Sequence, residues 1–273
     1  MSPAAIAAAF RAACRAELDA LKPGNVHRFA AGHGMEVAQF EAAAEAAAPF
    51  IAAPGASVGA RIAGAVAASM AAAGCNTNLG IVLLCAPLAA AAERGGKLRE
   101  TVAQVLAGLT VADAEGAFRG IALANPGGLG RAEAHDVAAP ATVTLLAAMA
   151  AAADRDRIAW QYTHGFSDIF EIGLARRADM ADTEADARTE AVHLAFMAAF
   201  PDSHIARKFG AAVAEEVRAE AAAVARAVDW HAPTARRHPP LAAFDASLKA
   251  RGLNPGTSAD LTVATLFAAR LGG

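Results

Sequence analysis

The chain has 273 residues, of which 56% are hydrophobic, and this composition excludes an intrinsically disordered protein. Its 24 Lys and Arg residues are outnumbered by 27 Asp and Glu residues, which gives a formal net charge of -3. A surface that binds nucleic acid non-specifically needs clustered positive charge, so we expect no nucleic-acid partner and only a local phosphate site.

Alanine dominates the sequence, aromatic residues make up only 5%, and no strong alternating strand pattern is present. The sequence therefore predicts an all-α protein, with a single compact domain of about twelve helices over residues 1–273. In chain order, the predicted helices cover residues 3–21, 35–49, 57–73, 79–93, 97–109, 112–123, 140–153, 156–176, 183–200, 205–227, 241–249 and 258–271. Thr110 with Asp113, and Thr183 with Asp186, have the spacing of capping pairs.

The cysteine spacing and the N-terminal sequence bear on the cellular location. The three cysteines lack metal-ligand spacing and the chain does not open with a signal-peptide pattern, so we expect a cytoplasmic protein. Residues 62–92 carry no charge, but Gly74, the polar residues 76–78 and Pro87 interrupt them. This favours two buried helices over a membrane span, and we expect no membrane partner. Ala-rich helix faces are compatible with a homodimer, although periodicity does not decide it.

Two polar segments lie at predicted helix ends in the first third of the chain. After the first helix, Pro23-Gly24 forms a turn, which leaves Lys22 either as a phosphate partner or as a C-terminal lysine that offsets the helix dipole. At the second segment, Asn76 and Asn78 either bind a ribose or a base edge or cap the next helix.

Two further segments carry acidic residues. The loop 125–140, with Arg131, Glu133, His135 and Asp136, is interpreted as a cover over a site or as a surface excursion.

In the predicted helix 156–176, the spacing of three, four and three places Gln161, His164, Asp168 and Glu171 on one face. Two carboxylates one turn apart can hold Mg²⁺, so Asp168 and Glu171 are predicted metal ligands; a solvated helix face is the alternative.

The C-terminal segment joins a turn to a helix start. Asn254-Pro255-Gly256 breaks any preceding helix, and Ser258 and Asp260 then lie beside free backbone N–H groups. Such a helix start suits a phosphate, whereas Thr257 followed by Asp260 is also an ordinary capping pair.

Four sequence blocks occur in a characteristic order: K-P-G-N-V-H at 22–27, G-C-N-T-N-L-G at 74–80, P-D-S-H-I at 201–205, and N-P-G-T-S-A-D-L at 254–261. Together, over about residues 14–271, they resemble the triphosphoribosyl-dephospho-CoA synthase family. The resemblance implies transfer of the triphosphoribosyl group of ATP to a hydroxyl of 3′-dephospho-CoA, with release of adenine, in prosthetic-group biosynthesis. It also implies ATP as co-substrate, and Mg²⁺ is the expected cofactor.

On this reading, the predicted site residues have three roles. Substrate or phosphate contacts fall to Lys22, Asn25, His27, Asn76, Asn78, Gly256 and Ser258. Catalytic roles fall to His164, Asp168 and Asp260, and metal binding to Asp168, Glu171 and Asp202.

Several positions depart from the family pattern. Asn78-Leu79 stands where the family has His-Lys, His204 replaces an asparagine, Lys208-Phe209 replaces Arg-Gly, and Thr257 replaces a glycine. These changes suggest a paralogue that uses another hydroxyl acceptor, for instance in the biosynthesis of a pterin- or furan-based one-carbon carrier. Two further alternatives are an enzyme acting on another phosphorylated nucleoside and a non-catalytic helical scaffold or cofactor-binding protein.

Overall fold

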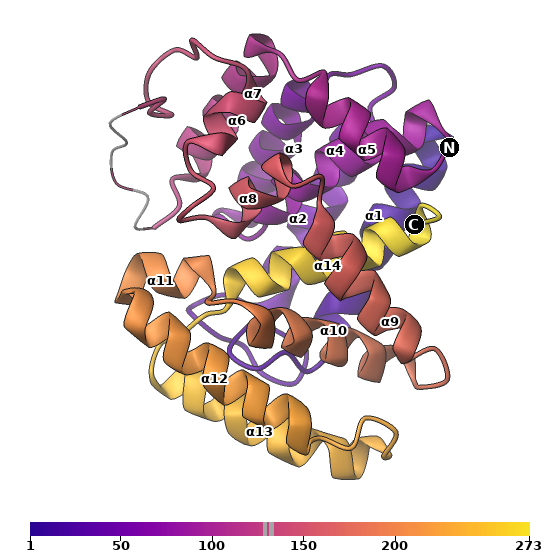
Figure 1. The fold of residues 1–273 in the computed structure, drawn as a ribbon, viewed down its shortest axis with the longest axis vertical. Helices are drawn as coiled ribbons and strands as arrows, with labels where there is room; N and C mark the ends of the chain where they lie inside the picture. The colour runs from indigo at the N-terminus through magenta and orange to yellow at the C-terminus, as the bar shows by residue number, and fades with distance from the viewer. Residues whose placement is uncertain (128–129, 131–133) are drawn as a thin grey trace. The chain divides into compact units, whose positions relative to one another are not determined.

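The structure, a computed structural model, describes residues 1–127, 130 and 134–273 (Figure 1). Arg131 and Glu133 of the predicted covering loop lie outside these residues. Within the described ranges the chain forms fourteen α-helices and one π-helix, and no β-strand, which confirms the all-α prediction. By its contacts the chain divides into two compact units, one of residues 1–13, 38–167 and 267–273 and the other of residues 14–37 and 168–266. The single domain predicted from the sequence stays a prediction.

The first unit is built from helices between residues 3 and 163, together with the C-terminal end of the chain. They are the first part of α1 (Pro3–Asp19), α2 (Val37–Ile51), α3 (Val58–Ala73), α4 (Leu79–Arg94), α5 (Leu98–Ala107), α6 (Val111–Ala124), α7 (Leu145–Ala150) and α8 (Arg157–Thr163), with the end of α14 (Gly256–Arg270). Thr110 caps α6 in a capping box with Asp113, as predicted.

Glycines set how closely α3 and α6 approach. A Cβ added at Gly59 would lie 2.5 Å from the Cα of Asp113, and one added at Gly116 would collide with the Gly59 backbone. The Gly59 N–H also donates to Asp113 Oδ1 at 2.8 Å. The two backbones therefore touch at a point where no side chain fits.

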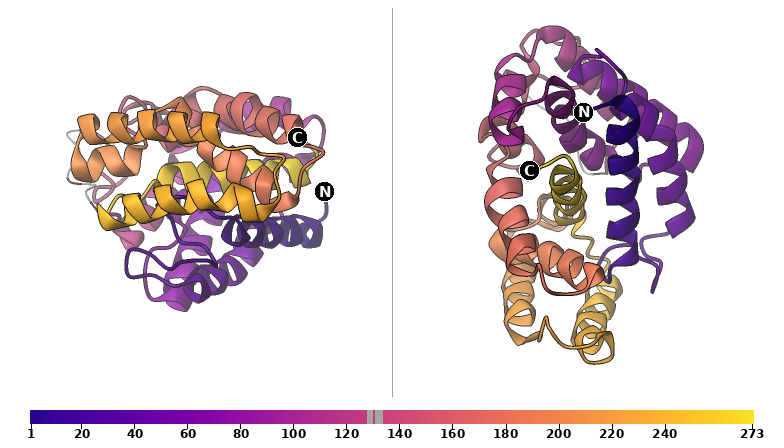
Figure 2. Two further views of the ribbon diagram at one scale, coloured as in Figure 1. Left: turned by 90° about the horizontal axis from the view of Figure 1, so that it is seen from below. Right: turned by 90° about the vertical axis from the view of Figure 1, so that its right-hand side faces the viewer.

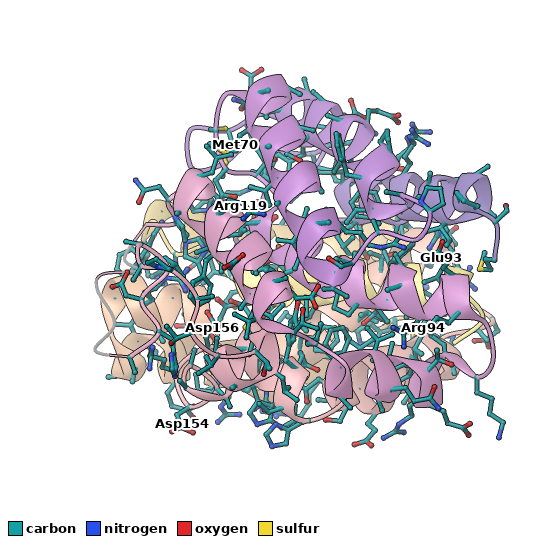
Figure 3. The ribbon with its side chains drawn as sticks, turned by 90° about the horizontal axis from the view of Figure 1, so that it is seen from above. Met70, Glu93, Arg94, Arg119, Asp154 and Asp156 are labelled. Atoms are coloured by element: carbon teal, nitrogen blue, oxygen red, sulfur yellow. The ribbon has the colours of Figure 1, made fainter. Side chains whose placement is uncertain are left out.

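Polar side chains fix the edges of this unit. Asp156 caps α8 by accepting from the N–H groups of Ile158 and Ala159 at 2.9 and 3.2 Å, and Glu93 pairs with the buried Arg61; Asp156 and Glu93 are labelled in Figure 3. Such caps satisfy N–H groups that the helix itself leaves open.

Helix α4 forms the apolar centre of the first unit, and fourteen of its sixteen residues are buried. No single described helix is long and apolar enough to cross a membrane, and α4 with α5 meets that test only as a pair bent by 112°.

The second unit contains the end of α1, the π-helix Ile169–Leu174, and six helices. These are α9 (Ala175–Asp179), α10 (Ala185–Ala199), α11 (Ser203–Phe209), α12 (Ala211–Ala227), α13 (Thr234–Ala250) and most of α14. Figure 2 shows α12 and α13 lying side by side. The core of the second unit includes Leu194, Ile205, Val217, Leu241 and Leu248, from α10 to α13.

Three helix predictions after residue 155 were wrong. The helix expected over 156–176 is interrupted by Gly165 and Phe166, both at a φ of 60°, and continues as a π-helix. The helix expected over 205–227 breaks at Gly210, whose φ is 93°. The last of the three, expected from residue 241, already begins at residue 234, because ion pairs from Arg237 to Asp186 and Glu190 hold its first turns.

Candidate functional site

The turn after α1 is seated against the start of α14. Gly24 has a φ of 80°, and a Cβ there would lie 2.7 Å from Pro255 Cδ and 2.8 Å from Leu248 Cδ1. Its N–H donates to Asp245 Oδ1 at 2.8 Å. Only glycine combines this left-handed backbone with so close an approach, which explains the glycine of the K-P-G block.

Lys22 lies entirely inside the protein. Its ammonium pairs with the buried Glu17 and donates to Asn25 Oδ1 at 3.0 Å, and Asn25 Nδ2 in turn donates to Asn254 Oδ1 at 2.8 Å. Burial lowers the pKa of Lys22 and raises that of Glu17, and their mutual attraction opposes both shifts. The first and last sequence blocks thus meet through one hydrogen-bond network.

His27 belongs to a second polar group on the same turn. Its Nε2 lies 3.4 Å from Asp245 Oδ2 and 3.3 Å from Lys249 Nζ, and Lys249 donates to Asp245 Oδ2 at 3.0 Å. Burial lowers the pKa of His27, so the ring is biased toward its neutral form. Burial alone would raise the pKa of Asp245, but hydrogen bonds from His27, Lys249 and Gly24 lower it below its usual value.

Asp202 joins the starts of α11 and α14. Its Oδ1 accepts from the N–H groups of His204 and Ile205 at 2.9 and 3.3 Å, and its Oδ2 accepts from Ser258 N and Oγ, each at 2.8 Å. Burial raises the pKa of Asp202, against the effect of these hydrogen bonds. The carboxylate therefore occupies the helix start at which the sequence predicted a bound phosphate.

Gly256 and His204 pack against each other at the same place. A Cβ at Gly256 would lie 2.6 Å from His204 Nδ1, so this glycine makes room for the imidazole. His204 Nε2 is buried and has no hydrogen-bond partner within the described part of the chain, and burial lowers the pKa of the ring to about 4.

His193, on α10, is the residue of this site that the sequence reasoning missed. Its side chain is fully buried, and its surroundings include Lys22, the Pro23 backbone, His27 and the Ser258 backbone. Among the described residues no strictly aligned hydrogen bond reaches its ring nitrogens, but the backbone of Pro23 and Ser258 lies close enough to act as hydrogen-bond partner of the protonated ring. The only sequence signal is a single histidine inside the apolar run A-V-H-L-A-F at 191–196.

The predicted carboxylates do not assemble into a common ligand set in the described chain. Asp168 is buried at the start of the π-helix, Glu171 is exposed, and the oxygens of Asp202 hold the two helix starts. Asp260 is half-buried and electrostatically close to Lys22. The metal and catalytic roles of these four residues stay predictions.

The remaining predicted residues belong to the first unit, whereas the residues above belong to the second. His164 is exposed and stacks on Trp160 at 3.8 Å between ring centroids. Because the helix is interrupted after Thr163, the expected common face of Gln161, His164, Asp168 and Glu171 does not form.

Asn76 and Asn78 have partners that serve the fold. Asn76 Oδ1 accepts from the N–H of Leu79 at 3.2 Å, at the start of α4. Asn78 Nδ2 donates to Ser69 Oγ at 3.0 Å, and that hydroxyl donates to Ala43 O at 3.2 Å. The bond of Asn76 favours the helix-capping alternative, whereas the Asn78 side chain contacts α3 and does not cap α4. A substrate contact stays a prediction for both.

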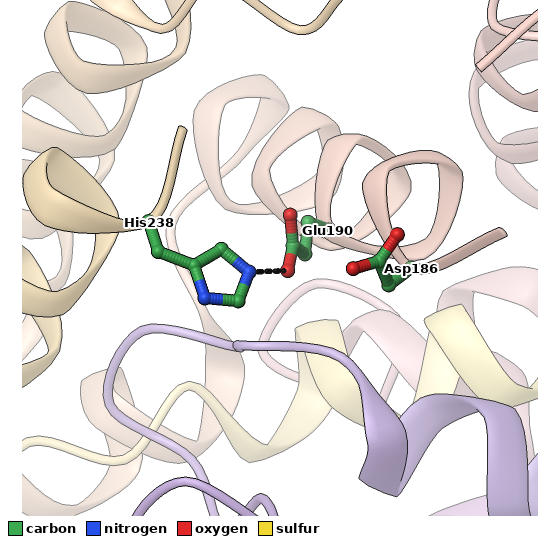
Figure 4. A group of neighbouring side chains, drawn as sticks. All are labelled: Asp186, Glu190 and His238. Atoms are coloured by element: carbon green, nitrogen blue, oxygen red, sulfur yellow. Dashed lines mark hydrogen bonds and ion pairs between the residues drawn. The ribbon is translucent and has the colours of Figure 1, made fainter. Parts of the chain in front are cut away.

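A different acidic group gathers in the second unit. Asp186, Glu190 and His238 bring one ligand atom each within 4.8 Å of one another (Figure 4). However, Arg237 pairs with Asp186 at 2.9 Å and with Glu190 at 2.7 Å, and Glu190 also accepts from the Leu21 N–H at 3.2 Å and contacts His238 Nε2 at 2.8 Å. This arrangement is a buried ion-pair network around Arg237, not an open cation site.

Comparison with known proteins agrees with the four sequence blocks. The family model described as ATP:dephospho-CoA triphosphoribosyl transferase (CitG) matches residues 3–273. The fold is similar to a crystal structure from Archaeoglobus fulgidus whose proposed assignment is triphosphoribosyl-dephospho-CoA synthase. The TM-score is 0.66 at 24% sequence identity, covering 84% of this chain and 96% of that chain. No curated protein matches the sequence. Because the family model spans nearly the whole length, the chain belongs to the ATP:dephospho-CoA triphosphoribosyl transferase family.

Proposed function

We propose that this protein transfers the triphosphoribosyl group of ATP to a hydroxyl of 3′-dephospho-CoA and releases adenine. Family membership over residues 3–273 supports the reaction. The observation that carries the site is the hydrogen bond from Asn25 to Asn254, which joins the first and last sequence blocks around the buried Lys22. Perturbed, buried ionisable groups gathered in one place are typical of functional sites.

The reaction sets clear demands on the site. A bond forms between the acceptor oxygen and the anomeric carbon of the ribose, and the bond from that carbon to adenine breaks. The hydroxyl loses one proton and adenine gains one, while positive charge develops on the sugar. A carboxylate beside the sugar stabilises that charge. Asp260 and Asp168 are our candidates, because both belong to the same unit as Lys22 and its partners Glu17 and Asn25.

A protein-held Mg²⁺ has weaker support. The predicted ligands Asp168, Glu171 and Asp202 do not form a common set among the described residues, and Asp202 already accepts four hydrogen bonds. Mg²⁺ normally binds through carboxylates together with substrate phosphates. We therefore propose Mg²⁺ as a companion of ATP, without an assigned set of protein ligands.

Two classes of compound are candidates for the hydroxyl acceptor. His204, Asn78-Leu79 and Lys208-Phe209 depart from the family pattern that the sequence blocks resemble. These departures favour a paralogue acting on another hydroxyl, such as a precursor of a pterin- or furan-based carrier, as the alternative to dephospho-CoA. A cytoplasmic location and a homodimer complete the proposal, and the chemistry requires neither.

The test follows free adenine by chromatography after incubation with ATP, Mg²⁺ and dephospho-CoA or candidate carrier precursors. We expect adenine release with one acceptor and a higher melting temperature with ATP, because a ligand that binds the folded state stabilises it. Asp260→Asn should lower turnover by about 100-fold or more, the scale of a lost transition-state charge contact.

Asp154→Asn, at an exposed position, is the matched control and should keep full turnover. The scaffold alternative makes the opposite prediction. Under it, no acceptor yields adenine and ATP leaves the melting temperature unchanged.

A further inference from the structure

The half-buried ring of His204 lies beside the first residue of α14. A Cβ added at Gly256 would be 2.6 Å from His204 Nδ1, so the imidazole packs directly on the helix start. No group in the described ranges forms a hydrogen bond with Nε2, the other ring nitrogen. Because polar atoms shielded from water are normally paired, the free nitrogen indicates that a group from outside the chain binds at this ring.

Positive charge gathers around His204. Arg207 and Lys208 follow it by three and four positions in α11, so the three side chains share one face of that helix. Burial, and then the charges of Lys208, Arg207 and His33, lower the pKa of His204 to about 4, and no carboxylate of the described chain contributes to that shift. In a protein with a net charge of -3, this is a local positive patch.

His33 reaches the patch from the segment after α1. Its Nε2 donates to Gly24 O at 2.8 Å, and Gly24 packs against Pro255, the residue before Gly256. The backbone φ of His33 is 57°, in the left-handed region that residues other than glycine rarely adopt. Such a conformation persists only where the surroundings fix it. The exposed imidazole of His33 is therefore held beside the turn 252–256.

The charges of these groups define the class of ligand. Lys208 is exposed, and its ammonium pairs with no carboxylate in the part of the chain that the structure describes. An ammonium, an imidazole N–H and the start of a helix all favour an anion. The Asp202 carboxylate already accepts from Ser258 N and Oγ. A ligand anion must therefore bind to the side chains around the helix start, not to the Ser258 N–H.

We propose that Lys208, His204 and His33 bind the phosphate chain of a substrate beside the start of α14. This inference rests on the transferase function proposed above, whose substrates carry a triphosphate on ATP and a diphosphate on dephospho-CoA. Lys208 supplies a positive charge, the neutral ring of His204 donates from Nε2, and His33 in its charged form donates from Nδ1.

Inorganic tripolyphosphate tests the site without any turnover. Isothermal titration calorimetry should show that it binds the wild type, and that binding weakens as salt is added, because exposed charges are screened. Lys208→Gln should weaken binding about 10-fold, the scale of one lost hydrogen bond to a charged group, with an unchanged melting temperature because Lys208 is exposed. His204→Leu should weaken binding by a similar factor and should not lower the melting temperature, because it removes an unpaired polar atom.

Arg226→Gln is the matched control. It removes the same charge from an exposed position of the same unit, in the last turn of α12, whereas α11 precedes the first turn of that helix. This variant should bind tripolyphosphate as the wild type does. Equal weakening by Arg226→Gln and Lys208→Gln would reduce the effect to general charge and overturn the inference. A wild type that does not bind tripolyphosphate would overturn it as well.

Steady-state kinetics of adenine release identify the substrate that supplies the phosphates. In Lys208→Gln, a KM for ATP raised about 10-fold at nearly unchanged kcat would assign the patch to the triphosphate, and a raised KM for the acceptor would assign it to the acceptor's diphosphate. Unchanged KM values for both substrates would overturn this inference while the proposed function stands. If the wild type releases no adenine, the proposed function fails, and the tripolyphosphate titration still decides whether the phosphate site exists.

Discussion

Asp202 and Ser258 lie 56 positions apart in sequence, and the carboxylate of Asp202 joins them by hydrogen bonds. The carboxylate accepts two N–H groups at the start of α11 and both donors of Ser258 in α14. Asn25 and Asn254 form a comparable link between the first and last blocks. The sequence could mark each of these residues as part of a polar turn, but their partners depend on tertiary structure, which spacing along the chain does not contain.

Replacing Asp202 tests how much stability this carboxylate provides. Asp202→Ala leaves four donors without their acceptor and should lower the free energy of unfolding by about 3 kcal/mol. Asp156→Ala is the matched control, because Asp156 makes the same two capping bonds at α8, and it should cost only about 1 kcal/mol. Urea titrations followed by circular dichroism measure both values. Equal losses would mean that the bonds to Ser258 contribute nothing.

At the scale of elements, helices with clear ends were predicted well and interrupted ones were not. Thr110 and Asp113 predicted the start of α6, and the structure has that capping box. Thr183 was wrong as a cap, since its hydroxyl donates to Met180 O at 2.8 Å and α10 begins after Glu184. The break at Gly165 and Phe166 was missed because one glycine in a helical pattern is usually tolerated. Phe166, a bulky residue with positive φ, carries no such signal in sequence.

The close approach of α3 and α6 can be tested by replacing its glycines. Gly116→Ala should destabilise the protein by about 2 to 3 kcal/mol, although alanine favours a helix, because its Cβ would collide with the Gly59 backbone, which cannot rotate away. Gly120→Ala, one turn later in α6, meets side chains rather than backbone, Ile62 Cγ2 at 3.2 Å and Val66 Cγ2 at 3.5 Å, and should stay within about 1 kcal/mol of wild type. Thermal melts of the two variants decide this, and similar melting temperatures would contradict a backbone-limited crossing.

At the scale of the whole molecule, the sequence blocks are distributed over two units. Lys22, Asp202 and Ser258 belong to one unit, whereas Asn76 and His164 belong to the other. Asn76 was expected to join the others because the order of their blocks matches the family, and His164 because of the polar face predicted for the helix 156–176. Order along a chain does not specify which compact unit a residue joins, so this part of the site could not be predicted.

The division into units bears on how the molecule unfolds. The boundaries at 13/14 and 266/267 fall inside α1 and α14, so each unit contains part of both helices. Unfolding one unit alone would have to break two continuous helices in their middle, which forfeits cooperative hydrogen bonds. We therefore predict one cooperative transition, as for a single domain.

The chain's two tryptophans allow a direct measurement, because Trp160 belongs to the first unit and Trp230 to the second. In Trp230→Phe only the first unit fluoresces, and in Trp160→Phe only the second does. Trp230→Phe also loses the bond from Nε1 to Ala225 O at 3.2 Å, so each fluorescence curve is compared with the circular dichroism curve of the same variant. We expect the two curves to superimpose in both variants across a urea titration. Fluorescence midpoints that differ from the circular dichroism midpoint, or a two-step circular dichroism curve, would show that the units unfold independently.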